Sequence, residues 1–171
     1  MESIKDIEKR LLRLDEDADL LFEDEGRFTC ILVGGSALIL LGYITRETHD
    51  IDVLKTPPEL LSLLSKYDMN NNVSAHMDNF PDDYLDRVQK LDLPTQKIDF
   101  YTLSLEDLVV SKLAAGRDKD LADIATPKVL EALDWTQLEE SADLVEQGML
   151  SDRAKQEFEI SYREFVRWHR P

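Results

Sequence analysis

The chain has 171 residues, of which 43% are hydrophobic, and its 20 lysines and arginines face 36 aspartates and glutamates, giving a formal net charge of −16. This length suits one domain with a small helical appendage, and the apolar content suffices for a core. Because nucleic acids are polyanions, the charge disfavours a protein that grips RNA or DNA, unless basic residues gather locally. The N-terminus is charged, no later segment resembles a membrane span, and Cys30 has no partner for an intramolecular disulfide, which together indicate a cytoplasmic protein.

The first predicted element is a helix over residues 3–22, where apolar residues recur at helical spacing before a stop at Gly26. The acidic clusters Asp15–Asp19 and Glu23–Glu25 are interpreted as a solvated helix face and a linker, because their spacing does not fit a calcium-binding loop. Residues 28–33 then form a continuous apolar run, which predicts a central strand.

The next stretch alternates apolar runs with a glycine turn. Gly34-Gly35-Ser36 separates two apolar runs, which predicts a strand, a tight turn and a helix start with Ser36 as its cap. Glycines leave room for a ligand to approach the backbone, and amides at such a turn suit a phosphate.

A second strand is predicted at Asp50-Ile51-Asp52-Val53, after a polar link that contains Arg46 and Thr48. Alternate side chains of a strand share a face, so Asp50 and Asp52 would point the same way while Ile51 and Val53 face the core. Paired carboxylates repel each other, and a hard cation such as Mg²⁺ relieves that repulsion. A phosphate cradle beside a metal-binding acid pair is the equipment of phosphoryl or nucleotidyl transfer.

This succession of motifs resembles the nucleotidyltransferase superfamily that includes DNA polymerase β. Within it, the chain looks most like the AbiEii toxin-type bacterial enzymes and their uncharacterised relatives, over about two thirds of its length. The resemblance implies an NTP substrate, Mg²⁺ as the cofactor with Mn²⁺ as the alternative, and toxin–antitoxin or phage-defence biology. It assigns Asp50 and Asp52 to the metal and to catalysis, and it places the nucleotide on Gly34, Gly35, Ser36, Arg46 and Thr48.

Between this motif and the C-terminal region, weaker patterns predict a helix over residues 59–67, a short strand over 73–77 and a short helix over 81–88. Residues 96–103 predict a further strand with Ile98 and Phe100 inward. Asp99 alternates with them, and superfamily members commonly supply a third carboxylate from a later strand. Asp99 is therefore either a third metal ligand and catalytic base or an outward-facing polar residue.

Ser104-Leu105-Glu106-Asp107 is a capping pattern that opens a helix over residues 107–115, with Gly116 able to end it. The segment from Lys112 through Arg117, Lys119 and Asp120 to Asp123 resembles the second signature of the AbiEii-like group. That resemblance implies a catalytic Lys112 that binds the triphosphate, with Arg117 and Asp120 beside the nucleotide. A buried lysine needs an anion, and the alternative anion is a structural cluster of carboxylates.

Helices are also predicted over residues 129–133, 135–147 and 151–169, and the aromatic stripe of the last is interpreted as core or partner surface. We expect an α/β (α+β) protein, a mixed sheet flanked by helices with a nucleotidyltransferase-like core over residues 1–103 and a helical C-terminal region over 104–171. The leading hypothesis is transfer of a nucleoside monophosphate to an acceptor, which the charge predicts to be a protein or small molecule rather than RNA. The alternatives are a catalytically silent, antitoxin-like module that binds a cognate partner protein and an aminoglycoside-type enzyme.

Overall fold

The computed structural model describes residues 3–171, and the chain forms two compact units. Unit 1 contains the residues up to Ala75 together with Val88–Leu103, and unit 2 contains His76–Arg87 together with Ser104–Pro171. The chain therefore leaves unit 1, contributes residues 76–87 to the helical unit and returns to complete the sheet. Residues 76–87 fall inside the predicted core range of 1–103, because the local sequence carries no sign of their distant partners.

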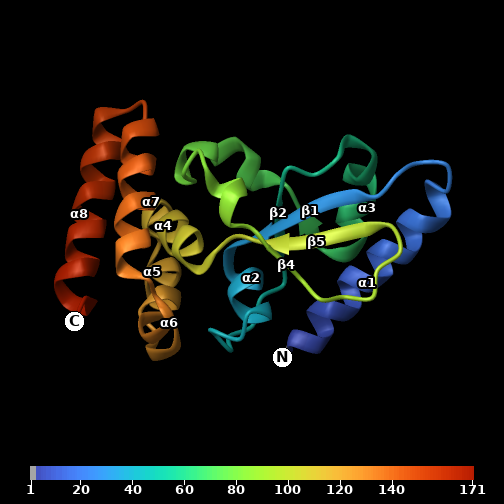
Figure 1. The fold of residues 1–171 in the computed structure, drawn as a ribbon, viewed down its shortest axis with the longest axis horizontal. Coiled ribbons are helices and arrows are strands. Elements are labelled where there is room, and N and C mark those ends of the chain that lie inside the picture. Colours follow the sequence, from blue (N-terminus) through green and yellow to red (C-terminus); the bar gives the residue numbers. More distant parts are fainter. Residues whose placement is uncertain (1–2) are drawn as a thin grey trace. The chain divides into compact units, whose positions relative to one another are not determined.

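Unit 1 is built on a five-stranded mixed sheet of order β3-β2-β1-β5-β4, which confirms the predicted α/β class (Figure 1). The central strand β1 pairs antiparallel with β2 and parallel with β5. The strands are β1 (Phe28–Val33), β2 (Ile51–Leu54), β3 (Met69–Asn70), β4 (Gln89–Lys90) and β5 (Ile98–Thr102).

The two faces of this sheet differ in character. One face is closed by fully buried side chains, which include Leu32, Ile51, Val53 and Phe100, so the predicted inward residues of β2 and β5 are confirmed. Cys30 lies on the same face as Leu32, and burial raises the pKa of its thiol to about 12. The other face carries Asp52 of β2 and Asp99 of β5, because alternate side chains of a strand point to opposite faces.

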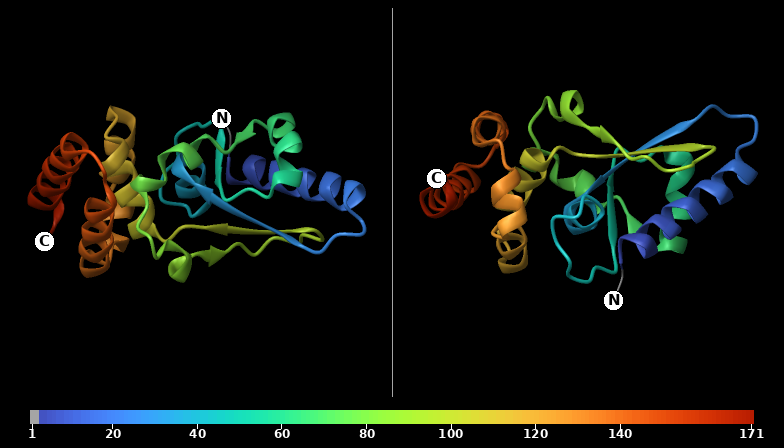
Figure 2. Two further views of the ribbon diagram at one scale, coloured as in Figure 1. Left: turned by 90° about the horizontal axis from the view of Figure 1, so that it is seen from above. Right: turned by 60° about the horizontal axis from the view of Figure 1, so that its bottom comes forward.

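Three helices belong to unit 1, and α1 contacts both others. Figure 2 shows α1 and α2 on the same side of the sheet. Residues 59–67 form a short α-helix between two 3₁₀ turns instead of one continuous helix. These elements are α1 (Ile4–Leu21), α2 (Gly34–Leu40), α3 (Leu61–Leu64) and the 3₁₀ helices η1 (Pro58–Leu60) and η2 (Ser65–Tyr67).

The acidic helix face predicted for α1 is only partly solvated. Asp15 is 3% exposed, and its carboxylate accepts hydrogen bonds from the backbone N–H groups of Gln96, Lys97 and Ile98 at 2.8, 2.8 and 2.7 Å. Unit 1 thus uses one acid of the cluster to fix the start of β5.

Unit 2 is helical, as predicted for the C-terminal region. Ser104 caps its first helix by accepting a hydrogen bond from the N–H of Asp107 at 3.2 Å, and Gly116 ends that helix with φ +66°. Phe158 and Phe165 of the last helix are buried, which confirms a core role for much of its aromatic stripe. The helices are α4 (Leu105–Ala115), α5 (Asp118–Ile124), α6 (Pro127–Ala132), α7 (Trp135–Gly148) and α8 (Asp152–His169).

Residues 76–87 contain the end of the 3₁₀ helix η3 and all of η4, and an ion pair joins them to the rest of unit 2. The strand predicted over residues 73–77 is wrong, because η3 spans Asn72–Asn79. Arg87, in η4 (Tyr84–Arg87), donates from Nε and Nη2 to the fully buried carboxylate of Asp107 at 3.0 and 3.1 Å. The Ser141 hydroxyl donates to the same carboxylate at 2.8 Å, so one acid joins η4, α4 and α7.

Within residues 3–171, no helix is both long enough and apolar enough to cross a membrane.

Candidate functional site

The glycine turn and the acid strand meet at the end of β1. Val33, the last residue of β1, pairs with Asp52 of β2. Gly34 follows with φ +69°, a left-handed conformation that favours glycine. A Cβ at Gly34 would lie 2.9 Å from Oδ2 of Asp52, so the half-buried carboxylate rests against the bare backbone of the turn.

Arg46 approaches the same turn from the polar link. A Cβ at Gly35 would lie 2.3 Å from Nη2 of Arg46, which only the absence of a side chain permits. Two consecutive glycines therefore lie against an acid and a guanidinium, and the nucleotide-binding role of Arg46 stays a prediction.

Ser36 is not the helix cap that the sequence predicted. The helix α2 begins at Gly34, with Val33 in the cap position, and Ser36 is buried inside the first turn. Its hydroxyl donates to the carbonyl oxygen of Val33 at 3.2 Å. In this structure Ser36 secures the turn between β1 and α2.

Asp50 lies immediately before β2 and is exposed, whereas Ile51 and Val53 are buried as predicted. The backbone at this point is held by the Thr48 hydroxyl, which donates to the carbonyl oxygen of Asp50 at 3.1 Å. Thr48 therefore holds the backbone of Asp50. The predicted nucleotide-binding role of Thr48 did not include this contact.

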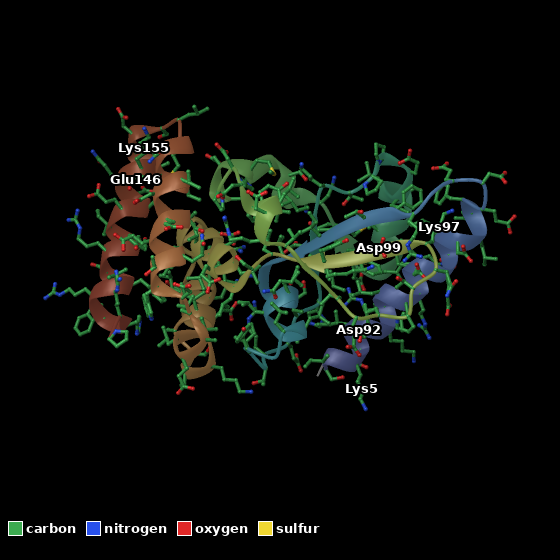
Figure 3. All side chains as sticks on the ribbon, in the orientation of Figure 1. Lys5, Asp92, Lys97, Asp99, Glu146 and Lys155 are labelled. Carbon is green, nitrogen blue, oxygen red and sulfur yellow. The ribbon has the colours of Figure 1, made fainter. Side chains whose placement is uncertain are left out.

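The structure does not bring Asp99 to the acid pair. Asp99 and Asp52 share a sheet face, but Asp99 pairs with Thr29 and Asp52 with Val33, four residues and about 13 Å apart along β1. Figure 3 shows Asp99 near the start of β5, beside Lys97. Its carboxylate binds Arg27 at 2.7 Å and Lys90 at 3.2 Å, and the Arg27 hydrogen bond lowers the pKa of Asp99. The surroundings of Asp99 match the second predicted alternative, an outward-facing polar residue, and ion pairs hold its side chain.

Lys112 and its neighbours form a closed ionic cluster within unit 2. The ammonium of Lys112, 4% exposed, lies 2.8 Å from Oδ1 of Asp120 and 2.9 Å from Oδ2 of Asp123. Arg117 donates from Nε to Oδ2 of Asp120 at 2.6 Å. Burial opposes ionisation of Asp120, but hydrogen bonds from Arg117 and Lys112 outweigh it and lower the pKa of that carboxyl. The anions that Lys112 needs are thus supplied by the protein.

Arg10 of α1 contacts this region and was missed from the sequence. It donates to the carbonyl oxygen of His49, directly before Asp50, at 2.9 Å. It also donates to the carbonyl oxygens of Tyr67 and Asp68 at distances of 2.7 to 3.0 Å. The sequence shows only an arginine within a predicted helix, which gives no sign that its side chain is half-buried in the structure. Its acceptors are backbone carbonyl oxygens, which leave no pattern in a sequence.

Asp50 and Asp52 remain the predicted magnesium ligands. Among residues 3–171, no group of three or more histidine, cysteine and acidic side chains could hold a metal ion. Mg²⁺ is commonly held by one or two carboxylates plus substrate phosphates, and these two acids supply hard oxygen donors.

Comparison with protein families identifies the class of the protein. Residues 9–170 match the family described as Nucleotidyltransferase of unknown function (DUF6036), so the chain belongs to that family. No curated protein and no solved structure shows significant similarity to the chain. The family match supports the predicted nucleotidyltransferase class, while the AbiEii-type relationship stays a prediction.

Proposed function

We propose that this protein is a cytoplasmic, Mg²⁺-dependent nucleotidyltransferase that transfers a nucleoside monophosphate from an NTP to a protein or small-molecule acceptor and releases pyrophosphate. The observation that carries the proposal is the contact between Asp52 and the glycine turn, with Oδ2 2.9 Å from the Cβ position of Gly34. This contact supports the proposal because Asp52, as a metal ligand, would lie beside a turn whose other charged neighbour, Arg46, can bind a phosphate.

The proposal assigns roles to five residues of unit 1, which are Gly34, Gly35, Arg46, Asp50 and Asp52. Gly34 and Gly35 let the Asp52 carboxylate and the Arg46 guanidinium lie against one backbone turn, and Arg46 would donate to the phosphate oxygens of a bound NTP. Asp50 and Asp52 hold the metal, which when bound would neutralise charge on the phosphates and support attack by the acceptor. Lys112, Arg117 and Asp120 are omitted, because they bind one another within unit 2.

The net charge favours a particular kind of acceptor. A chain with 36 acidic and 20 basic residues carries an excess of negative charge, which repels RNA and attracts cations. A cationic small molecule or a basic protein segment therefore reaches the site more readily than a polyanion does.

The test begins with calorimetric titration of the four NTPs in the presence of Mg²⁺. We expect micromolar binding of at least one NTP to the wild type and its loss in Asp52→Asn, which removes a charge at nearly constant volume. Asp99→Asn is the matched control on the same sheet face, and we expect it to keep the affinity within about twofold, since its ion pairs are half-exposed. Equal loss in Asp99→Asn would return Asp99 to the metal site.

Transfer is then measured with α-labelled NTP and three acceptors: total tRNA, aminoglycosides and the protein alone. Label in an acceptor, abolished by Asp52→Asn, supports the enzyme and identifies its substrate class. Labelled aminoglycoside favours the small-molecule alternative. If the wild type binds no NTP, the proposal is refuted. The catalytically silent, antitoxin-like module would then be the remaining hypothesis.

A further inference from the structure

The geometry around α1 points to Arg10 as the positioning residue of the acid pair. We infer that Arg10 fixes the backbone that carries Asp50 and thereby sets the geometry in which Asp50 and Asp52 receive a metal. This inference rests on the proposed function of those two acids, and it assigns to α1 a part in the site although α1 supplies no ligand.

Arg10 holds the chain directly before Asp50. Its Nη2 donates to the carbonyl oxygen of His49 at 2.9 Å, and that carbonyl belongs to the peptide bond that leads into Asp50. On the other side of this bond, Thr48 donates its hydroxyl to the carbonyl oxygen of Asp50 at 3.1 Å. Successive carbonyls of an exposed segment are thus each held by a side chain, which fixes a residue that the sheet itself does not hold.

Arg10 also holds the partner of the next residue. The N–H of Ile51, between the two acids, donates to the carbonyl oxygen of Asp68 at 3.0 Å. The same carbonyl accepts from Nη2 of Arg10 at 2.9 Å, and the carbonyl of Tyr67 accepts from Nε and Nη2 at 3.0 and 2.7 Å. One guanidinium therefore joins residues 49 and 67–68, the two chain segments that enter β2 and β3.

The planar guanidinium suits this task. Its several N–H donors lie in a fixed plane, so one side chain can serve three carbonyl oxygens whose positions are then set relative to one another. A metal site tolerates little displacement of its ligands, and small shifts in supporting residues reduce affinity and rate. Loss of Arg10 should therefore weaken the metal site more than it weakens the fold.

The experiment uses Mn²⁺ as the probe, titrated with a non-hydrolysable NTP analogue and followed by electron paramagnetic resonance. We expect Arg10→Met to weaken Mn²⁺ binding about tenfold, the scale of a lost supporting contact at a metal site. Arg10→Lys should recover part of the affinity, because an ammonium can serve some of the three carbonyls. Hydrogen exchange is measured in parallel, and the amides of residues 49–52 should exchange faster in Arg10→Met.

Two control variants separate this role from general effects. Arg13→Met removes the same charge from an exposed position of the same helix. Asp17→Asn weakens a different tie between α1 and the segment 65–68, because Asp17 binds Lys66 at 2.6 Å and accepts from the Tyr67 hydroxyl. Both controls should bind Mn²⁺ as the wild type does, even where Asp17→Asn lowers the melting temperature.

The outcomes separate the inference from the proposed function. If the wild type binds Mn²⁺ and Arg10→Met binds it equally, the role of Arg10 is refuted while the nucleotidyltransferase proposal stands. An Asp17→Asn variant that loses affinity as much as Arg10→Met would reduce Arg10 to a structural tie and also refute the inference. A wild type that binds neither Mn²⁺ nor the analogue would overturn both. Should Arg10→Met fail to fold, Arg10→Lys carries the same comparison.

Discussion

At the scale of single residues, the structure explains why glycine occupies both position 34 and position 35. Gly34 adopts φ +69° and faces Oδ2 of Asp52, and Gly35 faces the guanidinium of Arg46. The motif read from the sequence is therefore a device that lets two oppositely charged side chains approach one backbone turn. The sequence could predict the turn and the acids, but it could not show that Arg46 and Asp52 converge on neighbouring glycines.

Gly34→Ala should damage both the fold and the site. A left-handed conformation costs an L-residue about 1–2 kcal/mol, and the new methyl group would push the Asp52 carboxylate away. We expect the free energy of unfolding in urea to fall by about that amount and Mg²⁺-dependent NTP binding to be lost. Gly26→Ala is the control, since a Cβ there meets nothing within 4 Å, and an identical loss of binding in both variants would contradict the prediction.

Lys112→Met tests whether the ionic cluster of unit 2 is structural. The substitution leaves the carboxylates of Asp120 and Asp123 buried without the ammonium between them. Breaking a buried pair by removing one partner typically costs about 3–5 kcal/mol, so we expect a large drop in the melting temperature. Lys119→Met, exposed and nearby, should change it little. A stable Lys112→Met variant that no longer binds NTP would instead restore Lys112 to the nucleotide site.

Asp99 shows where residue-level prediction stops. A period of two fixes which face of a strand a side chain occupies, and the shared face of Asp99 and Asp52 follows from it. Position along the neighbouring strand depends on register, which distant loops and packing determine. The sequence therefore predicted the face of Asp99 but not the four-residue displacement that separates it from Asp52.

At the scale of elements, α1 acts as a support for several separate segments. Asp15 binds the start of β5, Arg10 binds the segments that enter β2 and β3, and Asp17 binds Lys66 and Tyr67. The helical period predicted α1 well, because its apolar residues recur regularly. Its polar contacts were not predictable, since their partners are far away in the chain and most of them are backbone groups. The strand predicted over residues 73–77 was wrong for a different reason. Apolar and polar residues alternate there only briefly, and such a short pattern does not require a strand.

Asp15→Ala should destabilise the sheet through the start of β5. Three backbone N–H groups lose one common acceptor, and an unsatisfied buried donor costs about 1–3 kcal/mol. We expect the free energy of unfolding to fall by at least about 2 kcal/mol, measured by urea denaturation. Glu16→Ala removes the next acid, which is exposed, and should stay within about 0.5 kcal/mol of the wild type. Equal stability of the two variants would show that water replaces the Asp15 carboxylate.

At the scale of the whole molecule, composition and charge predicted the broad class of the protein. They gave no information about how the chain divides into its two units. The net charge of −16 and the apolar content predicted a globular protein that does not grip nucleic acid broadly. They could not reveal that residues 76–87 belong to unit 2, because this depends on contacts with residues far along the chain, such as the pair of Arg87 with Asp107. The many acids also make the stability of the molecule depend on pH, in a direction that its ion pairs determine.

Stability should fall as the pH drops below about 4, and Asp120 should contribute to that fall. The pKa of Asp120 in the folded protein lies below its ordinary value, because Arg117 and Lys112 outweigh its burial. The unfolded chain therefore binds the proton first, so the stabilisation is complete above the ordinary pKa and disappears as the pH falls through the lowered one. Urea unfolding at pH 7 and pH 3 should show that Asp120→Asn loses less stability on acidification than the wild type does. Asp118→Asn, exposed on the same helix, should keep the wild-type dependence, and parallel losses in all three proteins would contradict a role for the Lys112 cluster in acid unfolding.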